Sequence, residues 1–151
     1  MLKAPARRRP IVLLVDDNPG DRQLTRIAFD EAQVDAEFIE VSDGVEALIR
    51  LHELLASGVV PKLAIVDLNM PRMNGWELLG KLKGSAFQRM WRVAFTGSRS
   101  ASDCQRAIAQ GADACIDKPR TLDDLGELMD QFCRFLQSTG LHPRPANAAT
   151  N

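Results

Sequence analysis

The sequence contains no tyrosine and only three cysteines, which are scattered along the chain. None of the cysteines has the CxxC spacing of zinc or redox sites. No apolar stretch approaches the roughly 20 residues that a membrane-spanning helix needs, and residues 1–9 lack the apolar segment of a secretory signal. We therefore expect a cytoplasmic protein with reduced thiols and no contact with a membrane.

An excess of charge of one sign is also missing. The 19 Lys and Arg residues nearly balance the 20 Asp and Glu residues, for a formal net charge of −1. No overall basic field favours nucleic-acid binding, and we interpret residues 1–9, with their short basic cluster, as a flexible tail. The length of 151 residues with 45% hydrophobic residues is enough for one domain, predicted over residues 10–138. Residues 139–151 are predicted to be disordered.

Short apolar runs alternate with amphipathic segments along the chain. The predicted strands cover residues 11–15, 37–41, 63–66, 93–95 and 114–116. The predicted helices cover residues 21–33, a segment from 43 or 44 onward, 76–83, 100–110 and a segment starting at 121. Continuous apolar strands between helices predict an α/β domain with a parallel sheet covered on both faces. The run at 37–41 alternates with acids, which suits a strand nearer the sheet edge.

Polar residues follow four of the five predicted strands: Asp16 with Asp17, then Asp67, Thr96 and Lys118. Ligands of open parallel sheets bind beyond the carboxyl ends of the strands, where the strand order reverses. If the order is 2-1-3-4-5, that point lies between the first and third strands. The two acids after the first strand would then lie beside Asp67, and the threonine and the lysine would flank them.

Three carboxylates in one cleft repel one another unless a cation neutralises them. Mg²⁺ suits this task because it prefers oxygen ligands and tolerates phosphate oxygens in its shell. With the metal held by Asp17 and Asp67, one Asp67 oxygen remains to attack phosphorus and form an aspartyl phosphate. Lys118 and the Thr96 hydroxyl would stabilise charge on the transferred group.

Five short motifs occur at the ends of the predicted strands or in the loops that follow them. They are Val15-Asp16-Asp17-Asn18-Pro19, Val66-Asp67-Leu68-Asn69-Met70-Pro71, Gly75, Phe95-Thr96-Gly97-Ser98 and Asp117-Lys118-Pro119. In this order they resemble the receiver domain of bacterial response regulators over about residues 10–138. The resemblance implies a flavodoxin-like, doubly wound five-stranded parallel sheet with helices on both faces.

The resemblance also implies a role for each matching residue. Asp67 would accept a phosphoryl group from the phosphohistidine of a kinase. Asp17 would bind Mg²⁺ directly, Asp16 chiefly through water, and the Asn69 carbonyl would complete the protein ligands.

The other matching positions concern the switch and the lifetime of the phosphate. Thr96 would be the switch hydroxyl and Lys118 would pair with the phosphoryl group. The Lys118–Pro119 peptide would be cis. Asn69 and Ser98 lie at positions that tune the rate of phosphate loss in the family.

One position departs from the family pattern. Receivers commonly carry an aromatic residue three positions before the lysine, and here that residue is Cys115. The usual aromatic switch is therefore missing. The sequence leaves open how phosphorylation would change the surface formed by the last two predicted helices. We expect Cys115 to be a small buried packing residue.

After Ser138 we expect no output domain and no DNA-reading module, so output would come from protein contacts or onward phosphotransfer. The chain would be no enzyme beyond catalysing its own phosphorylation and dephosphorylation at Asp67. The opening motif looks like that of single-domain regulators that accompany bacterial phytochromes. The implied partners are a sensor histidine kinase, such as a bacteriophytochrome, a downstream protein or phosphotransfer partner, and a second copy in a homodimer.

Three alternatives stay open at this point. A pseudo-receiver would bind partners without phosphorylation. A haloacid-dehalogenase-type phosphatase also uses an aspartyl phosphate, but its two acids lie two residues apart, whereas Asp16 and Asp17 are adjacent. A flavodoxin-like cofactor binder is disfavoured because the carboxylates would repel a flavin phosphate.

Overall fold

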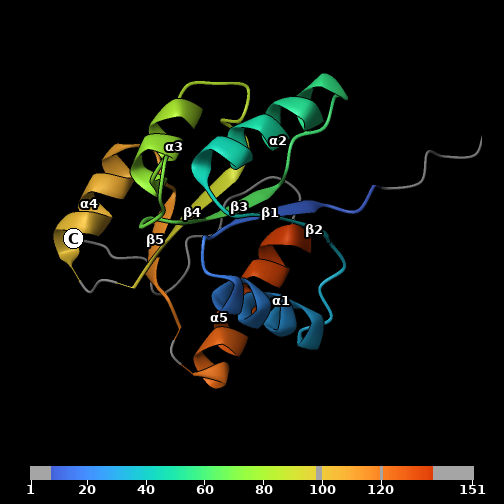
Figure 1. Ribbon diagram of the computed structural model, residues 1–151. Helices are drawn as coiled ribbons and strands as arrows, with labels where there is room; N and C mark the ends of the chain where they lie inside the picture. Colours follow the sequence, from blue (N-terminus) through green and yellow to red (C-terminus); the bar gives the residue numbers. More distant parts are fainter. Residues whose placement is uncertain (1–7, 98–99, 120, 138–151) are drawn as a thin grey trace, which may run out of the picture.

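Five parallel strands form one sheet in the order β2-β1-β3-β4-β5 in the computed structural model of the chain (Figure 1). The structure describes residues 8–97, 100–119 and 121–137. In chain order the strands are β1 (Ile11–Val15), β2 (Glu37–Val41), β3 (Leu63–Asp67), β4 (Trp91–Thr96) and β5 (Ala114–Asp117). The predicted strand order is confirmed, and β2 lies at the sheet edge as its alternating sequence indicated.

The central strands are buried and mostly apolar because helices cover both faces of the sheet. Every residue of β1, β3 and β4 is buried. The register places Val15 beside Val66, one residue before the acids that follow β1 and end β3. Asp67 lies beside Phe95 of β4, and Thr96 lies beside Asp117 of β5. The polar residues at the strand ends therefore gather along one edge of the sheet.

Five helices connect the strands and close the domain. They are α1 (Pro19–Glu31), α2 (Gly44–Ala56), α3 (Gly75–Leu82), α4 (Ala101–Ala109) and α5 (Leu122–Gln137). Helices α1 and α5 cover one face of the sheet, and α2, α3 and α4 cover the other (Figure 1). On the first face Phe29 of α1 stacks on Phe132 of α5 with ring centroids 6.0 Å apart, and Trp91 meets Phe132 edge-on at 5.8 Å. The sheet thus separates one apolar core beneath α1 and α5 from the apolar side chains beneath α2, α3 and α4.

Polar caps fix where the helices begin near the carboxyl edge of the sheet. Helix α1 begins at Pro19 rather than at the predicted Asp21, because proline suits the first helical position and Asn18 caps the helix. The Asn18 side chain accepts a hydrogen bond from the Asp21 amide at 3.1 Å. Asp43 caps α2 in the same way, accepting from the Glu46 amide at 2.9 Å. These caps hold the helix starts close to the strand ends that carry the polar residues.

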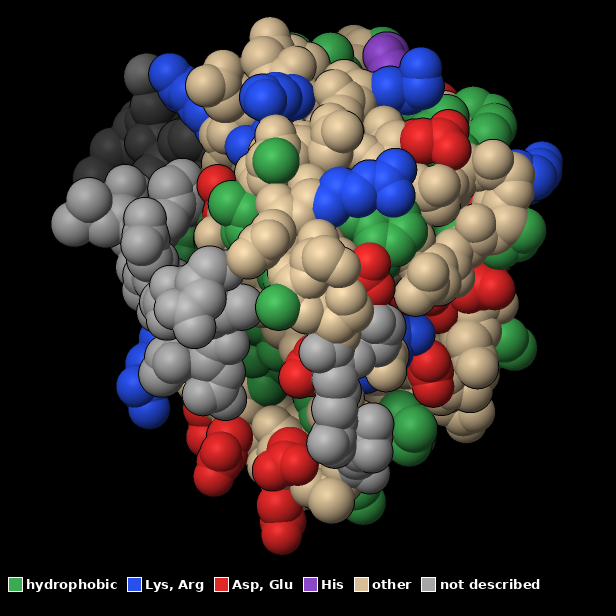
Figure 2. Space-filling view, turned by 90° about the vertical axis from the view of Figure 1, so that its left-hand side faces the viewer, with side chains coloured by type: hydrophobic (Ala, Val, Ile, Leu, Met, Phe, Trp, Pro, Cys, Tyr) green, Lys and Arg blue, Asp and Glu red, His purple; other side chains and the backbone are tan. Residues whose placement is uncertain are grey.

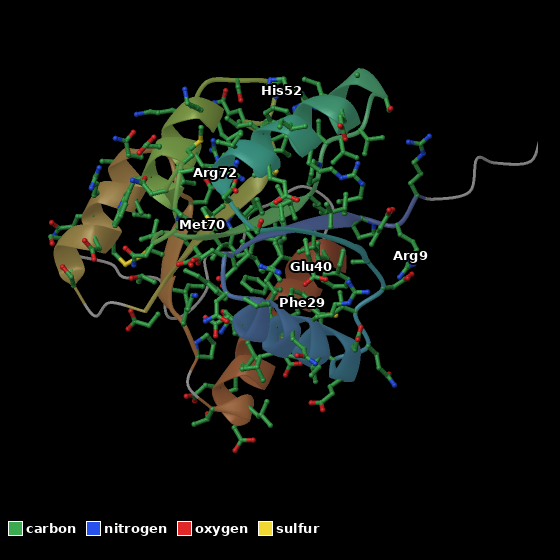
Figure 3. All side chains as sticks on the ribbon, in the orientation of Figure 1. Arg9, Phe29, Glu40, His52, Met70 and Arg72 are labelled. Atoms are coloured by element: carbon green, nitrogen blue, oxygen red, sulfur yellow. A yellow bond between two sulfur atoms is a disulfide. The ribbon has the colours of Figure 1, made fainter. Side chains whose placement is uncertain are left out.

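Cys104 of α4 and Cys115 of β5 are joined by a disulfide, drawn as a yellow bond beside α4 in Figure 3. The prediction of reduced thiols is wrong for this pair, although Cys115 is buried as expected, with 2% of its surface exposed. Helix α4 packs against β5 and brings the two Cα atoms to 5.5 Å, within the range that a disulfide requires. A separation of 11 residues in the sequence did not indicate this contact. Cys133 keeps its thiol.

The predicted terminal tails fall mostly outside the described residues, which do not include 1–7 and 138–151. Arg9, the last residue of the predicted N-terminal tail, donates hydrogen bonds to the Asp35 carboxylate at 2.8 Å and to the Ala36 carbonyl at 2.9 Å. From Arg9 onward the chain is therefore attached to the edge of the sheet beside β2.

Figure 2 shows the face that carries α3 and α4, where hydrophobic side chains are scattered among charged ones rather than gathered in one patch. Across the part of the chain that the structure describes, no helix combines the length and the apolar content needed to cross a bilayer.

Candidate functional site

Three carboxylates meet where β1 and β3 end side by side. Oxygen atoms of Asp16, Asp17 and Asp67 all lie within 4.8 Å of one another. Asp16 and Asp67 are buried, with 3% and 5% of their surface exposed, whereas Asp17 is exposed. The sheet order brings these residues together from positions about fifty residues apart, as the pattern of strand ends predicted.

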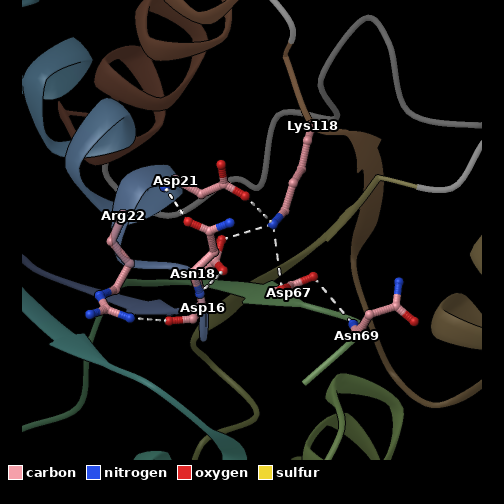
Figure 4. Close-up of polar contacts among 7 residues, drawn as sticks. All are labelled: Asp16, Asn18, Asp21, Arg22, Asp67, Asn69 and Lys118. Carbon is pink, nitrogen blue, oxygen red and sulfur yellow. Dashed lines mark hydrogen bonds and ion pairs between the residues drawn. The ribbon is translucent and has the colours of Figure 1, made fainter. Parts of the chain in front are cut away.

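Lys118 reaches this cluster from the end of β5 (Figure 4). Its Nζ donates to Asp21 Oδ2 at 2.8 Å and to Asp16 Oδ2 at 3.0 Å, and it lies 3.5 Å from Asp67 Oδ2. The distance to Asp67 makes an ion pair, whereas the other two contacts are hydrogen bonds. The lysine therefore bridges the acidic cluster and the first turn of α1.

The surroundings of Asp67 disfavour its charged form. Burial, reinforced by the negative charge of Asp16 and a hydrogen bond shared with Asp17, raises the pKa of Asp67 to about 7. The positive charge of Lys118 and a hydrogen bond from the Asn69 amide act in the opposite direction but do not cancel this effect. In the absence of a metal ion, these surroundings favour the neutral form of Asp67.

The same carboxylates keep Lys118 charged. Burial alone would lower the pKa of Lys118, but the hydrogen bonds to Asp21 and Asp16 and the charge of Asp67 raise it above its usual value. A permanently charged ammonium group thus lies at the carboxyl ends of the strands, within ion-pair distance of Asp67.

The loop after β3 is held against the acidic cluster by its backbone. The Asn69 amide donates to Asp67 Oδ1 at 3.2 Å, and the Gly75 amide donates to the Leu68 carbonyl at 3.0 Å. A Cβ atom at position 75 would lie 2.7 Å from Leu68 Cα, closer than packed atoms approach. Only glycine lets the start of α3 come this near to Asp67, so Gly75 helps to position the carboxylate.

Thr96 ends the strand next to Asp67 and is fully buried. Its carbonyl accepts a hydrogen bond from the Lys118 amide at 2.8 Å, which ties the ends of β4 and β5 together. The predicted site residues Asp16, Asp17, Asp67, Asn69, Thr96 and Lys118 thus all lie along one edge of the sheet. Ser98 lies outside the described residues.

The Lys118–Pro119 peptide is trans, since the described residues contain no cis peptide bond. The cis geometry expected from the family resemblance is therefore wrong for this structure. Peptides that precede proline prefer trans by about 0.5–1 kcal/mol, and here the trans form is compatible with the hydrogen bond from the Lys118 amide to Thr96.

The donor atoms at the cluster fit a hard divalent cation. Three carboxylates supply oxygen ligands of the kind that Mg²⁺ and Mn²⁺ prefer, and one of them is open to solvent, which leaves room for water. The raised pKa of Asp67 supports the same conclusion, because a cation at the cluster would favour the charged carboxylate.

No role for Asp21 was predicted from the sequence, although its contact to Lys118 is the shortest that the lysine makes. Its position could have indicated this contact. Asp21 is an acid in the first turn of the helix that follows Asp16 and Asp17, and this turn lies at the same edge of the sheet. A pocket of about 130 Å³ opens beside this contact, between α1 and the start of α5, and is lined in part by Asp21, Leu24 and Leu122.

The chain is similar to a known protein family and to several known proteins. Residues 12–130 match the response regulator receiver domain. The probable methanogenesis regulatory protein FilR2 of Methanothrix harundinacea is 30% identical over 139 residues, which cover 90% of this chain and 89% of that protein. Other relatives are much longer, and the chain spans 13% of the sensor histidine kinase RcsC of Salmonella typhi, to which it is 28% identical.

Several solved structures have the same fold as this chain. The phosphorylated cyanobacterial phytochrome response regulator RcpA is 27% identical with a TM-score of 0.78, over 90% of this chain and 99% of that chain. The Mn(2+)-bound form of response regulator Rcp1, a protein known from Synechocystis, is 26% identical with a TM-score of 0.74, over 89% and 99% of the two chains.

Proposed function

Because this chain belongs to the response regulator receiver domain family, we propose that it is a single-domain response regulator that accepts a phosphoryl group on Asp67 from a sensor histidine kinase. The observation that carries the proposal is the placement of Asp67 at the end of the central strand. There it is buried between a metal-binding set of carboxylates and the ammonium group of Lys118. Membership of this family also removes the haloacid-dehalogenase-type phosphatase as an alternative.

The proposed reaction transfers the phosphoryl group from the phosphohistidine of the kinase to the carboxylate of Asp67, with no change of oxidation state. An ionised Asp67 oxygen attacks phosphorus, the phosphorus–nitrogen bond of the phosphohistidine breaks, and the imidazole leaves with its electron pair and takes up a proton. The product is a mixed anhydride on Asp67. Attack by water later releases inorganic phosphate and restores the carboxylate, so the chain catalyses only these two reactions on itself.

We assign Asp16, Asp17, Asp67 and the Asn69 carbonyl as the residues that hold Mg²⁺. When bound there, the ion supplies positive charge that keeps Asp67 ionised and neutralises the phosphoryl oxygens. The Mn(2+)-bound form of Rcp1 supports a divalent cation in this family.

Lys118 and Thr96 stabilise the phosphorylated state in this proposal. Lys118 already lies 3.5 Å from Asp67 and carries a full charge, so it can pair with a phosphoryl oxygen after a small movement. The Thr96 hydroxyl donates to another phosphoryl oxygen. Since the carbonyl of Thr96 is hydrogen-bonded to the Lys118 amide, a change at one residue reaches the other.

The proposed partners are supported by the relatives. RcpA is a phytochrome response regulator, which supports a sensor kinase of the bacteriophytochrome type as the phosphate donor. Output is proposed to pass through protein contacts of the domain itself, to a downstream protein or phosphotransfer partner, with a homodimer as one assembly. We place these contacts in the cytoplasm, in keeping with the match to sensor-kinase sequences.

The test is phosphorylation by a small-molecule phosphodonor such as acetyl phosphate, with and without Mg²⁺. Intact mass and size-exclusion chromatography serve as readouts, and Asp67→Asn as the control. We expect one added phosphoryl group that requires Mg²⁺ and is absent in the variant. A folded wild-type protein that binds Mg²⁺ but takes up no phosphate would instead identify a pseudo-receiver.

A further inference from the structure

We propose that Asp21 is a positioning residue that competes with the metal-binding carboxylates for the ammonium group of Lys118, so that Mg²⁺ can displace the lysine and enter the site. The inference deepens the proposed function and rests on its Mg²⁺ site. It concerns a residue outside the set of carboxylates to which we assign the metal.

The argument starts from the three contacts of Lys118 Nζ. The shortest is to Asp21 at 2.8 Å, the next is to Asp16 at 3.0 Å, and the longest is to Asp67 at 3.5 Å (Figure 4). Asp16 and Asp67 belong to the metal-binding cluster, whereas Asp21 does not. Asp21 is therefore the one carboxylate of the three that can keep the ammonium group when a cation occupies the other two.

The backbone of Asp21 is held at the start of α1, within reach of Lys118. It lies in the first turn of α1, and its amide is bound by the capping side chain of Asn18 at 3.1 Å. Lys118 follows β5, which lies three strands away from β1 in the sheet. The Asp21–Lys118 contact thus spans the cleft from one side to the other.

Removing the Asp21 carboxylate leaves Lys118 with the two acids of the metal-binding cluster as its partners. The ammonium group then shifts toward Asp67, from ion-pair distance into hydrogen-bonding distance. An ammonium ion and Mg²⁺ compete for the same oxygens, so this shift weakens metal binding.

The same contact favours the charged form of Lys118, because hydrogen bonding to Asp21 raises the pKa of Lys118 against the effect of burial. Both side chains are partly exposed, at 21% for Lys118 and 39% for Asp21. Solvent therefore limits the strength of the pair, and we expect a moderate effect on Mg²⁺ affinity, about three- to fivefold.

The experiment measures the Mg²⁺ dissociation constant by isothermal titration calorimetry on wild type, Asp21→Asn and Asp21→Glu. We expect Asp21→Asn to weaken Mg²⁺ binding about three- to fivefold, and Asp21→Glu, which keeps the charge, to retain most of the affinity. Asp30→Asn is the matched control, because it removes one exposed carboxylate from the other end of the same helix. Thermal unfolding followed by circular dichroism checks that each variant is folded.

A double-mutant cycle with Lys118→Met separates positioning from the simple loss of a negative charge. If Asp21 acts through Lys118, Asp21→Asn has no more effect than Asp30→Asn in the Lys118→Met background. An equal loss of affinity in both backgrounds would overturn the proposal, because Asp21 would then act by its charge alone.

Phosphorylation by acetyl phosphate gives a second readout. With Asp21→Asn the Mg²⁺ concentration for half-maximal rate should rise by the same factor, while the rate at saturating Mg²⁺ changes by less than about twofold. A wild-type protein that binds no Mg²⁺ would refute the proposed function itself. Normal binding by wild type with no change in Asp21→Asn would refute only the role of Asp21.

Discussion

Replacing Asp67 by asparagine should stabilise the metal-free protein, and the gain should grow with pH. Asp67 is 5% exposed, and burial raises the pKa of its carboxyl from an ordinary 3.8 to about 7. The side chain of asparagine has nearly the same shape as the neutral carboxylic acid and never ionises. The substitution therefore removes the cost of holding a carboxylate in this place.

The direction of the pH dependence of the free energy of unfolding follows from the number of protons that the folded and the unfolded chain bind at Asp67. Below about pH 4 the carboxyl is neutral in both the folded and the unfolded chain, so it has no effect on the free energy of unfolding. Between about pH 4 and pH 7 the unfolded chain loses this proton and the folded chain keeps it, which lowers the free energy of unfolding by about 1.4 kcal/mol per pH unit. Above pH 7 both states are ionised and the penalty stays constant, with an upper limit of about 4 kcal/mol from the two pKa values.

The assay is urea unfolding followed by circular dichroism in the presence of a chelator, at pH 5 and pH 8. We expect Asp67→Asn to raise the free energy of unfolding by at most about 1–2 kcal/mol at pH 5 and about 4 kcal/mol at pH 8. Asp130→Asn, which changes an exposed carboxylate on α5, is the control and should show no such trend. An equal effect of Asp67→Asn at the two pH values would refute the reasoning, because a change in packing alone does not depend on pH.

Three further predictions concern the metal, the loop after β3 and the disulfide. Because the Asp67 proton must leave before Mg²⁺ binds, the affinity of wild type should fall about tenfold per pH unit below pH 7 and level off above it, as calorimetry between pH 5.5 and 8.5 would show; a flat profile would contradict this. Gly75→Ala should lower the free energy of unfolding by about 1–3 kcal/mol, since the new Cβ would meet the backbone of β3 and the residue after it, and an unchanged urea midpoint would contradict that. Without reductant, thiol titration of the denatured protein should find one thiol per chain, and with dithiothreitol three. Replacing both Cys104 and Cys115 by serine should lower the free energy of unfolding by up to about 3 kcal/mol under non-reducing conditions, and no loss there would show that the pair is not linked.

The strands and the acids that end them could be predicted from patterns along the chain, and the strand order from the family resemblance. Apolar runs that end in Asp16 and Asp67 mark buried parallel strands, and a doubly wound sheet then brings their ends together. The start of α1 was predicted two residues too late, because Asn18 and Pro19 begin the helix before the first apolar residue of its buried face.

Two features were not predicted because they depend on side chains that meet only in three dimensions. The Asp21–Lys118 contact joins residues 97 positions apart across the width of the sheet, and no spacing rule relates them. The disulfide depends on how closely α4 packs against β5, which the periodicity of either element does not determine. The cis peptide before Pro119 was expected from the family alone, and no residue of this chain required it.

The link between Cys104 and Cys115 closes a covalent ring that contains most of α4, the turn at Gly111 and the start of β5. Within this ring the helix cannot slide along the sheet without carrying the strand with it. Lys118 lies three residues after the linked cysteine, so the disulfide joins α4 covalently to the segment that carries the ammonium group near Asp67. While the ring is closed, we expect the amide hydrogens of α4 and β5 to exchange with solvent as one cooperative unit, and reduction to divide that unit in two.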